Sequence, residues 1–478
     1  MHVTRRPAQV ATECRAGLEM TPSRSVIIHD FTFKSPFFMS LGAFRLKRTV
    51  LVPVILVLAS VASISCGYSS KSYKPPSGLS TRVLVSQDVS SSSSLGGLLI
   101  VNGQKDTLAR ASEISAGNTP GLMTLSQTRA TLLAYDHSTV SVQVINTTTE
   151  TNTGRISLPG PVSSMVLPAT TSIGYATVPT AVINGYPPGA VEVMNLTTGS
   201  TTTIGVPNAQ TAISNANGSQ LLVFSPFSGP TVSNSVYVIS PLIAVPPVDQ
   251  GCDNLAASSV CKVVSGFDQP VYAIINGNTA YVLNCGAECG GTQASVMVLD
   301  LASLTITNTI PVNGATTGFL SGSTLYVAGT PKNTACPSST SAPSCGTLDI
   351  VDLNSMTDPN FTNHNPILIT DGYHDRIDMS LGGQLFIGSH TCTNVGNVNN
   401  PSGEVRGCLS IFNTTSGAVV IPPDNGDVTG LQSFGTRNVE YVAEGGTLRI
   451  YDTTKDVLQR TQIAIVGQVI DVKAIDFF

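Results

Sequence analysis

The stretch GTLDIVD, Gly346–Asp352, is followed a hundred residues later by GTLRIYD, Gly446–Asp452. In both runs apolar side chains alternate with polar or small ones, and both runs end in an aspartate. This two-residue period is typical of a β-strand with a buried face. The short carboxylate at the end can accept a hydrogen bond from its own backbone and begin a turn. The pair therefore predicts two equivalent strands, each followed by a tight turn.

The same pattern occurs eight times along the chain. Each copy follows another strand-like run, such as TLYVAG at 324–329, and usually one more apolar segment, and a further strand usually comes after it. Four strands in roughly 50 residues, repeated around a ring, is the arrangement of a β-propeller. The eight copies end at Asn102, Asn146, Asn195, Ser240, Asp300, Asp352, Asn413 and Asp452.

We therefore expect an all-β fold: one β-propeller over residues 82–478, with eight blades of four antiparallel strands, or seven blades if one hairpin is irregular. The first copy lacks its leading strand, whereas the chain ends with a surplus one, VIDVKAIDFF at 469–478. Pairing of residues 470–478 with the first blade would close the ring and leave no free sheet edge at the join.

The amino-terminal part resembles an export signal rather than a part of the fold. Residues 45–65 contain a basic stretch, an apolar run and then small residues, which is the order found in secretory signals. SISC at 63–66 resembles a bacterial lipobox, in which the cysteine becomes the lipidated first residue, although Ser63 stands where leucine is usual. Cleavage without lipidation and an uncleaved anchor are the alternatives.

These features divide the region before the propeller into three parts. A signal that starts at Met39 has normal proportions, whereas one that starts at Met1 has a long polar leader. A Ser- and Pro-rich segment after the signal cannot build a core and is typical of a flexible tether. We expect a mis-assigned or disordered leader at 1–38, a signal peptide at 39–65, a lipid anchor on Cys66 and a tether at 66–81.

The cysteines point to an oxidising compartment. Apart from Cys14 and Cys66, eight remain, and they fall as neighbours in sequence. An even number in a chain with an export signal favours disulfide bonds. A zinc site at Cys285 and Cys289 would have an unusual three-residue spacer and no accompanying Cys/His pair, so we expect neither a metal nor another cofactor. The simplest connectivity is four local bonds: Cys252–Cys261, Cys285–Cys289, Cys336–Cys345 and Cys392–Cys408.

The charge balance argues against nucleic acid as a partner. Removing residues 1–65 takes away eight basic and three acidic residues, which leaves 16 against 26 and a net charge of −10. A sparse, acidic surface without a basic patch is a poor match for a phosphate backbone.

The runs YVLN, residues 281–284, and VMVLDLASLTITNTIPV, residues 296–312, resemble the YVTN-type repeats of exported bacterial β-propellers. Together with the signal, the chain resembles a surface-antigen- or lactonase-like propeller lipoprotein, and the likeness covers nearly all of residues 80–478. The resemblance implies a fold and an envelope location but not an activity, because propellers with unrelated functions share such repeats. The absence of Trp weighs against a quinoprotein dehydrogenase.

A candidate site is suggested by comparing equivalent loops. In a propeller, the loops that enter the innermost strands lie on the same face as the loops between the second and third strands. The entrances read TPGL, GPVS, NAQT, DQPV, GATT, GYHDRID and DVTG, and only the sixth combines a ring, an imidazole, a guanidinium and carboxylates. We predict a binding rim formed by Tyr373, His374, Asp375 and Arg376, with His390 from a disulfide-closed loop and Tyr186 from the NGYPPG loop.

We interpret the chain as a non-enzymatic binding or scaffold module with no catalytic residues, anchored to the membrane by a lipid in the periplasm or on the outer surface. Its ligand would be an envelope protein, a glycan or a small molecule held around the central channel. The alternative is a lactonase-like hydrolase or a metal-dependent enzyme that uses His374, Asp375 and His390. A simple salt bridge of Arg376 with Asp375 or Asp378 would explain the same loop without any ligand.

The lipidation hypothesis predicts that the chain, expressed in a bacterial host, incorporates a fatty-acid label at residue 66. Cys66→Ser should lose the label, whereas Cys14→Ser should keep it, because only Cys66 lies at the signal boundary.

The start position at Met39 is tested by mass spectrometry of the precursor. Peptides from residues 1–38 in that precursor would contradict initiation at Met39.

Overall fold

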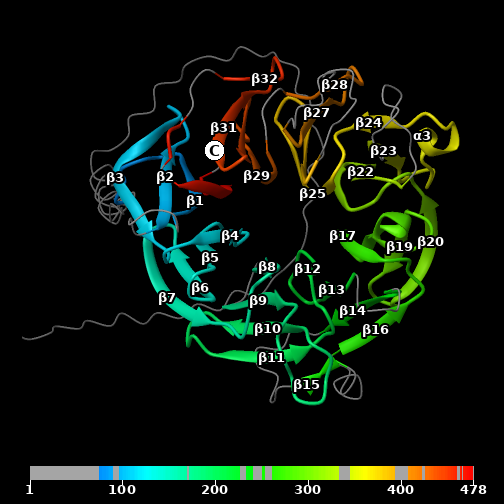
Figure 1. Ribbon diagram of the computed structural model, residues 1–478, viewed down its shortest axis with the longest axis horizontal. Coiled ribbons are helices and arrows are strands. Elements are labelled where there is room, and N and C mark those ends of the chain that lie inside the picture. The colour runs from blue at the N-terminus through cyan, green and yellow to red at the C-terminus, as the bar shows by residue number, and fades with distance from the viewer. Residues whose placement is uncertain are drawn as a thin grey trace, which may run out of the picture. The chain divides into compact units, whose positions relative to one another are not determined.

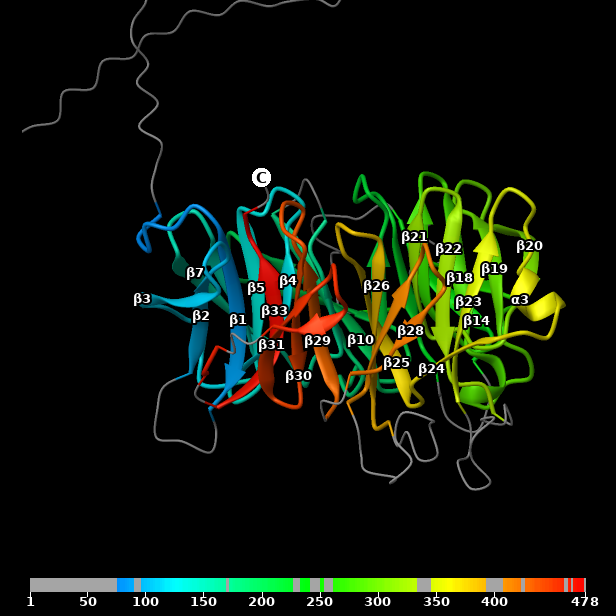
Figure 2. The ribbon, with the colours of Figure 1, turned by 90° about the horizontal axis from the view of Figure 1, so that it is seen from above.

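The protein is an eight-bladed β-propeller (Figure 1). The computed structural model describes residues 75–89, 96–168, 172–226, 233–240, 250–252, 261–332, 345–392, 407–422, 426–459, 463–465 and 467–476. Eight mostly antiparallel sheets follow one another around a central axis, and their strands run between the two faces of the ring (Figure 2). The sequence signals at 1–38, at 39–65 and at Cys66 lie outside the described residues. The expectation of eight blades is confirmed.

We count the strands of each blade from the central axis outward, so the first strand is innermost and the fourth lies at the rim. The blades are numbered in chain order, from blade 1, which contains β2, to blade 8, which contains β31. The innermost strands are β33 (Gln468–Ala474), β4 (Pro120–Leu125), β8 (Ser164–Val166), β12 (Thr211–Ser214), β17 (Pro270–Asn276), β21 (Thr317–Ser321), β25 (Tyr373–Met379) and β29 (Val428–Ser433). The second strands are β1 (Arg82–Asp88), β5 (Thr131–Asp136), β9 (Ile173–Val178), β13 (Leu221–Phe224), β18 (Thr279–Asn284), β22 (Thr324–Gly329), β26 (Gln384–His390) and β30 (Val439–Glu444).

The two outer positions are filled in the same way. The third strands are β2 (Gly97–Asn102), β6 (Ser141–Asn146), β10 (Ala190–Asn195), β14 (Ser235–Ile239), β19 (Ser295–Asp300), β23 (Gly346–Asp352), β27 (Leu409–Asn413) and β31 (Thr447–Asp452). The fourth strands are β3 (Thr107–Ser115), β7 (Thr151–Ser157), β11 (Thr201–Gly205), β16 (Cys261–Ser265), β20 (Thr305–Pro311), β24 (Ile367–Ile369), β28 (Val419–Val420) and β32 (Val457–Leu458).

The helical elements of the described chain are short: the 3₁₀ turn η2 (Gly286–Cys289) and α3 (Pro359–Thr362), in addition to the single helical residue Cys252. Asp358 begins α3 by accepting a hydrogen bond from the backbone of Asn360. No helix among the described residues is long and apolar enough to cross a membrane.

The repeated polar residue at the end of each third strand makes the turn that the sequence predicts. The side chain of Asn146 accepts hydrogen bonds from the backbone N–H groups of Thr148 and Thr149, at 2.9 and 3.0 Å. Asp300 bonds the backbone of Ala302 and Ser303 in the same way. Equivalent bonds occur at Asn102, Asn195, Asp352, Asn413 and Asp452, while the residues that follow Ser240 lie outside the described ones.

The apolar core lies between neighbouring blades rather than within one of them. In one cluster Leu283 and Val296 of blade 5 pack with Leu325 and Val351 of blade 6, and all four are fully buried. The second and third strands are buried on both faces for this reason, whereas fourth strands such as β20 are mostly exposed. Each blade therefore depends on both of its neighbours for burial.

The last strand of the chain closes the ring. β33 pairs antiparallel with β1, from Val83 opposite Ala474 to Asp88 opposite Gln468. β33 thus supplies the innermost strand that blade 1 lacks, which confirms the predicted closure. The figure shows the result, with the red carboxy-terminal strand beside the blue amino-terminal one (Figure 1).

Arg82 connects the start of β1 and the residues after β33 to blade 2. Its Nε and Nη2 atoms donate to the two carboxylate oxygens of Asp476, at 2.7 and 2.8 Å. Its Nη1 atom donates to Glu150 Oε1 at 2.9 Å and to the carbonyl of Thr147 at 2.7 Å. The Arg82 side chain is 8% exposed and that of Glu150 is 2% exposed, so both charges need these partners.

A second ion pair joins blade 8 to blade 1. Arg437 makes two parallel hydrogen bonds of 2.7 Å to the carboxylate of Asp106, and Tyr441 donates to the same carboxylate. Such a bidentate pair fixes orientation as well as distance. The junction where the ring closes is therefore held by backbone pairing and by two ionic clusters.

Blade 3 differs from the predicted four strands because it has five. The short β15 (Gln250–Gly251) comes from the loop between the third and fourth strands of blade 4, and it pairs parallel to β11. The Cys252–Cys261 disulfide directly follows β15 and ends at the start of β16, with the two Cα atoms 5.4 Å apart. This bond therefore connects the rims of blades 3 and 4.

The other disulfides also follow the predicted local pairing. Cys285–Cys289 and Cys392–Cys408 close loops between second and third strands, with Cα separations of 5.6 and 5.5 Å. Cys345 is also disulfide-bonded, while its predicted partner Cys336 lies outside the described residues. Disulfide bonds of this number indicate an oxidising, exported environment.

The closure contacts predict a large effect of Arg82→Met. The substitution leaves the buried carboxylate of Glu150 with its hydrogen bonds from Ser77 but without the guanidinium that balances its charge. We therefore expect a loss of about 3 kcal/mol in the free energy of unfolding. Denaturant titration under non-reducing conditions measures it. Arg110→Met, on the exposed side of β3, is the matched control and should stay within about 0.5 kcal/mol of the original chain. Equal losses in both variants would contradict the role given to Arg82.

Candidate functional site

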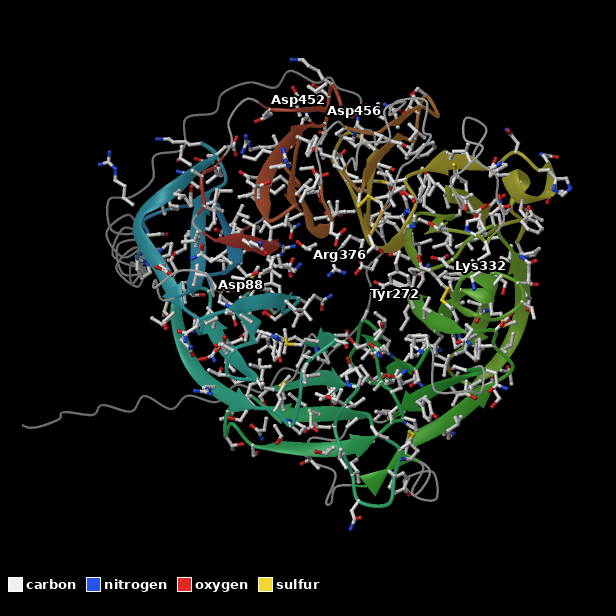
Figure 3. All side chains as sticks on the ribbon, in the orientation of Figure 1. Asp88, Tyr272, Lys332, Arg376, Asp452 and Asp456 are labelled. Carbon is white, nitrogen blue, oxygen red and sulfur yellow. A yellow bond between two sulfur atoms is a disulfide. The ribbon has the colours of Figure 1, made fainter. Side chains whose placement is uncertain are left out.

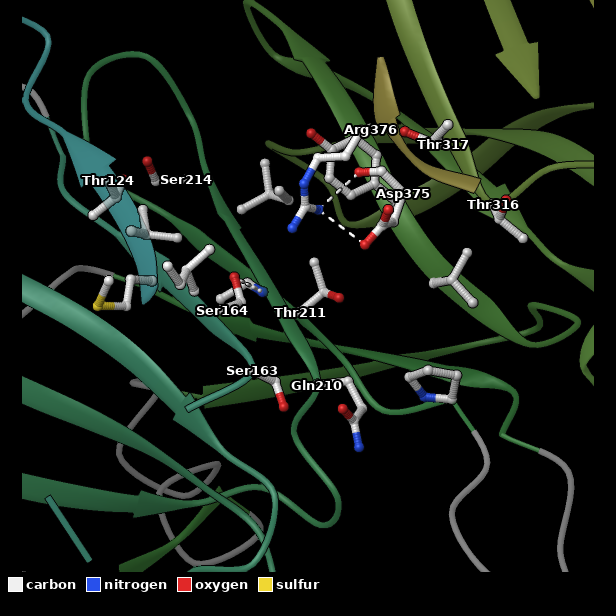
Figure 4. Close-up of a pocket in the computed structure, with 18 of the residues that line it drawn as sticks. Thr124, Ser163, Ser164, Gln210, Thr211, Ser214, Thr316, Thr317, Asp375 and Arg376 are labelled. Carbon is white, nitrogen blue, oxygen red and sulfur yellow. Dashed lines mark hydrogen bonds and ion pairs between the residues drawn. The ribbon is translucent and has the colours of Figure 1, made fainter. Parts of the chain in front are cut away.

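A cavity of about 720 Å³ lies among the innermost strands. It is bordered by β4, β8, β12, β17, β21 and β25, and most of its lining is apolar or carries neutral hydroxyl and amide groups (Figure 4). Among the described residues of the lining, Asp375 and Arg376 are the charged ones. We call this space the central cavity.

A local irregularity brings the side chains of Asp375 and Arg376 in β25 to the cavity. The register between β25 and β26 shifts between His374 and Arg376, so Asp375 is an extra residue in the strand. A bulge of this kind redirects side chains that would otherwise alternate between the two faces. Figure 4 shows Asp375 and Arg376 side by side in the cavity, joined by dashed lines.

Arg376 is held in place without using all of its donors. Its Nη1 atom donates to Asp375 Oδ2 at 2.9 Å, and its Nε atom donates to the backbone carbonyl of Thr429 at 2.8 Å. Its Nη2 atom has no hydrogen-bond partner among the described residues. The two side chains are 31% and 29% exposed, so this ion pair contributes little to stability. A ligand in the cavity could bind the free edge of the guanidinium.

His390 contacts the ion pair of Asp375 and Arg376 and connects it to Asp427 of blade 8. Its Nε2 atom is 3.0 Å from Asp375 Oδ1, and its Nδ1 atom is 3.7 Å from Asp427 Oδ2. The contact with Asp375 raises the pKa of His390, and the nearby charge of Asp427 raises it further. Partial burial and the charge of Arg376 lower this pKa, but the net shift is upward. The backbone N–H of Thr391 also donates to Asp427, at 2.7 Å. The Cys392–Cys408 disulfide begins two residues after His390 and fixes this loop.

His374 is not part of this cluster. The strand pairing sets His374 opposite Ser389 and Tyr373 opposite His390, so the two imidazoles project from opposite faces of the strand pair. The side chain of His374 is fully buried, and burial lowers its pKa to about 4. Its ring packs against Gly346, where an added Cβ would lie 2.9 Å from Cε1. The predicted convergence of His374 and His390 therefore does not occur.

No group of three or more His, Cys, Asp or Glu side chains in the described part of the chain is arranged to hold a metal ion. The contact between His390 and Asp375 remains as a pair that could hold or transfer a proton. Asp427, on the other ring nitrogen of His390, is 45% exposed and is not part of the cavity lining.

The predicted tyrosines differ in position. Tyr373 lines the central cavity and is 36% exposed. Tyr186 lies in the loop between β9 and β10 and packs against Gly251 of β15, where an added Cβ would be 2.0 Å from Tyr186 Cε1. Since β15 is the outermost strand of blade 3, Tyr186 does not contribute to the cavity.

Sequence reasoning missed Tyr272 and Asp427. Tyr272 of β17 lines the cavity, where burial raises its pKa and Arg376 opposes the rise. Figure 3 shows Tyr272 and Arg376 near the middle of the ring. Asp427 is the first residue of the entrance DVTG, and Tyr272 directly follows the entrance DQPV. The available signals were the aromatic residue that follows DQPV and the acidic residue of DVTG, next to the loop at 372–378.

Comparison with known proteins supports the fold alone. No protein-family model matches the chain, and no curated protein matches its sequence. Among solved structures, the chain is similar to the dihydro-heme d1 dehydrogenase NirN in complex with DHE, with a TM-score of 0.55 and 10% identity over 83% of this chain and 75% of that one.

Two other solved structures have lower scores. Apo AztD from Citrobacter koseri has a TM-score of 0.49 and 10% identity, over 82% of this chain and 97% of that chain. The β-propeller domain of Cps50 (Swd1) from Myceliophteria thermophila has a TM-score of 0.45 and 10% identity, over 70% and 96%. At such identities a shared activity does not follow from the shared fold.

The burial of His374 predicts a specific pH dependence of stability. Its pKa of about 4 in the folded chain lies below the usual value of about 6.5, so the unfolded chain takes up a proton first as the pH falls. The stability that neutral His374 allows is therefore lost between about pH 6.5 and pH 4. We expect His374 to account for about 2 kcal/mol of the loss between pH 7 and pH 5.

Denaturant titrations at the two pH values measure this loss. His374→Gln should show a loss smaller by that amount, whereas the exposed His137→Gln should behave like the original chain. An unchanged pH dependence in His374→Gln would show that the imidazole is not buried in its neutral form.

Proposed function

We propose that the protein is an exported binding module that takes a small polar molecule into the central cavity and does no chemistry on it. The observation that carries this proposal is the free edge of Arg376, which faces a cavity with no other cation in its described lining. Sites for small molecules usually occupy about 300–1,000 Å³ and orient their ligand with a few polar groups. The central cavity has this size and this distribution of groups.

The scaffold suits binding because the site needs no rearrangement. The lining comes from innermost strands that are fixed by their blades, and the His390 loop is closed by the Cys392–Cys408 disulfide. A preformed site loses little conformational entropy when its ligand arrives. The partly exposed pair of Asp375 and Arg376 adds little to stability, so binding is a better explanation for its position than folding.

The proposed location follows from the disulfides and from the sequence signals. We propose that the resemblance to YVTN-type propellers reflects an envelope protein, anchored to the membrane through a lipid on Cys66 in the periplasm or on the outer surface. In the predicted tether at 66–81, Ser77 bonds to Glu150 and Leu79 packs against the core, so the spacer is the part before residue 75. That part would hold the propeller away from the membrane and leave the cavity accessible to an envelope protein, a glycan or a small molecule.

A lactonase-like hydrolase is the second candidate, and it rests on His390 between two carboxylates. His390 Nε2 contacts Asp375 at the cavity wall, and its raised pKa suits a group that exchanges protons near neutral pH. His374 has no place in this version, because it projects from the opposite face of the strand pair. Turnover of a lactone panel that is lost in His390→Gln, with folding retained, would favour the hydrolase over the binding module.

The binding proposal predicts that Arg376→Met abolishes stabilisation by a cavity ligand. Thermal denaturation of the full chain with a library of anions, cations, zwitterions and neutral polyols identifies the ligand, which stabilises the folded chain by mass action. Loss of a hydrogen bond from a charged group should weaken binding about tenfold or more. Lys262→Met, on the exposed side of β16, should bind normally. Equal weakening in both variants, or no ligand at all, would contradict the proposal.

A further inference from the structure

We infer that the ligand of the central cavity is a neutral, polyhydroxylated molecule of the carbohydrate class. This inference rests on the proposed binding function and goes beyond it by naming the chemical class. It follows from three features of the lining: the balance of charge, the supply of hydroxyl groups and the presence of two tyrosine rings.

The charges of the cavity cancel one another. Arg376 is paired with Asp375 at 2.9 Å, and these are the charged residues of the described lining. A simple anion at the free edge of Arg376 would meet a guanidinium whose charge Asp375 already balances, and a simple cation at Asp375 would meet a carboxylate already balanced by Arg376. A neutral ligand can use the free Nη2 donor and leave the ion pair intact.

Uncommitted hydroxyl groups line the same cavity as this pair (Figure 4). The side-chain hydroxyls of several lining residues make no hydrogen bond to other described residues, so they can serve as donors and as acceptors for a ligand. Gln210 donates its amide nitrogen to Asn208 at 3.0 Å, which leaves its side-chain carbonyl oxygen as a further acceptor. Sugar hydroxyls have the same dual character. The hydroxyls in question belong to Thr124, Ser163, Thr211, Ser214 and Thr317.

Two aromatic rings complete the lining. Tyr272 and Tyr373 come from different blades, and both contribute to the cavity. A tyrosine ring offers a broad apolar face with a polar hydroxyl at its edge. The C–H faces of a sugar ring are apolar while its rim is polar, so this combination fits a carbohydrate better than it fits a uniformly polar ion.

A zwitterion is the chemical rival, because Arg376 and Asp375 could bind its two charges separately. That mode breaks their 2.9 Å contact and makes no use of the scattered hydroxyls. The two classes make different demands on the tyrosines. A sugar needs the ring faces, whereas a small zwitterion needs only the ion pair.

The test is binding of the full chain to an array of neutral glycans, followed by calorimetry with the best glycan, with glycine betaine and with citrate. We expect a neutral glycan to bind and the other two compounds not to bind. Tyr272→Ala and Tyr373→Ala should each weaken glycan binding at least tenfold, while Tyr272→Phe and Tyr373→Phe should retain most of it. Tyr186→Ala is the matched control, with the same residue type outside the cavity, and should bind normally. Thermal melting confirms that each variant folds.

The outcomes separate the two proposals. If betaine or citrate binds in an Arg376-dependent manner and no neutral glycan binds, the carbohydrate inference is wrong and the binding function stands. If no array glycan and no library compound binds, both are wrong. A glycan that binds equally well to the original chain and to both tyrosine-to-alanine variants occupies another site, which also overturns the inference.

Discussion

The pairing of β33 with β1 is the constraint on which the rest of the structure depends. Every blade buries its core against two neighbours, so a ring with one gap would expose apolar faces on both sides of that gap. β33 lies beside β4 and β29 as well as β1, and it therefore joins blades 8, 1 and 2 at once. Arg82 adds the ionic contact that holds the residues after β33 in place, through Asp476.

Closure also determines what the central cavity can be. The innermost strands surround one axis with their backbones fixed by the blades, and most of them contribute apolar or neutral side chains to the cavity. Charged side chains reach it where β25 departs from regular pairing. The bulge at Asp375 is this departure. It places two charges at the cavity wall while His374, one residue earlier, is buried in a structural role. Adjacent residues of a short polar run therefore have different surroundings.

Most of the architecture could be predicted because it is repeated. The eight strand patterns, the polar residues at Asn146 and its equivalents, and the surplus strand after residue 468 are local signals that repetition reinforces. The two-residue β15 could not be predicted, because two residues carry no periodicity and pair with another blade. The site was only partly predictable. The charged loop was visible, but its bulge, its contact with Asp427 about fifty residues later and the separation of the two imidazoles depend on strand register.

The position of β33 also has a consequence for biogenesis. The strand that completes the innermost layer is made last, so a chain that crosses a membrane from its amino terminus cannot form the closed ring until its final residues have crossed. Products that end early would keep an open sheet edge, which quality-control proteases can recognise.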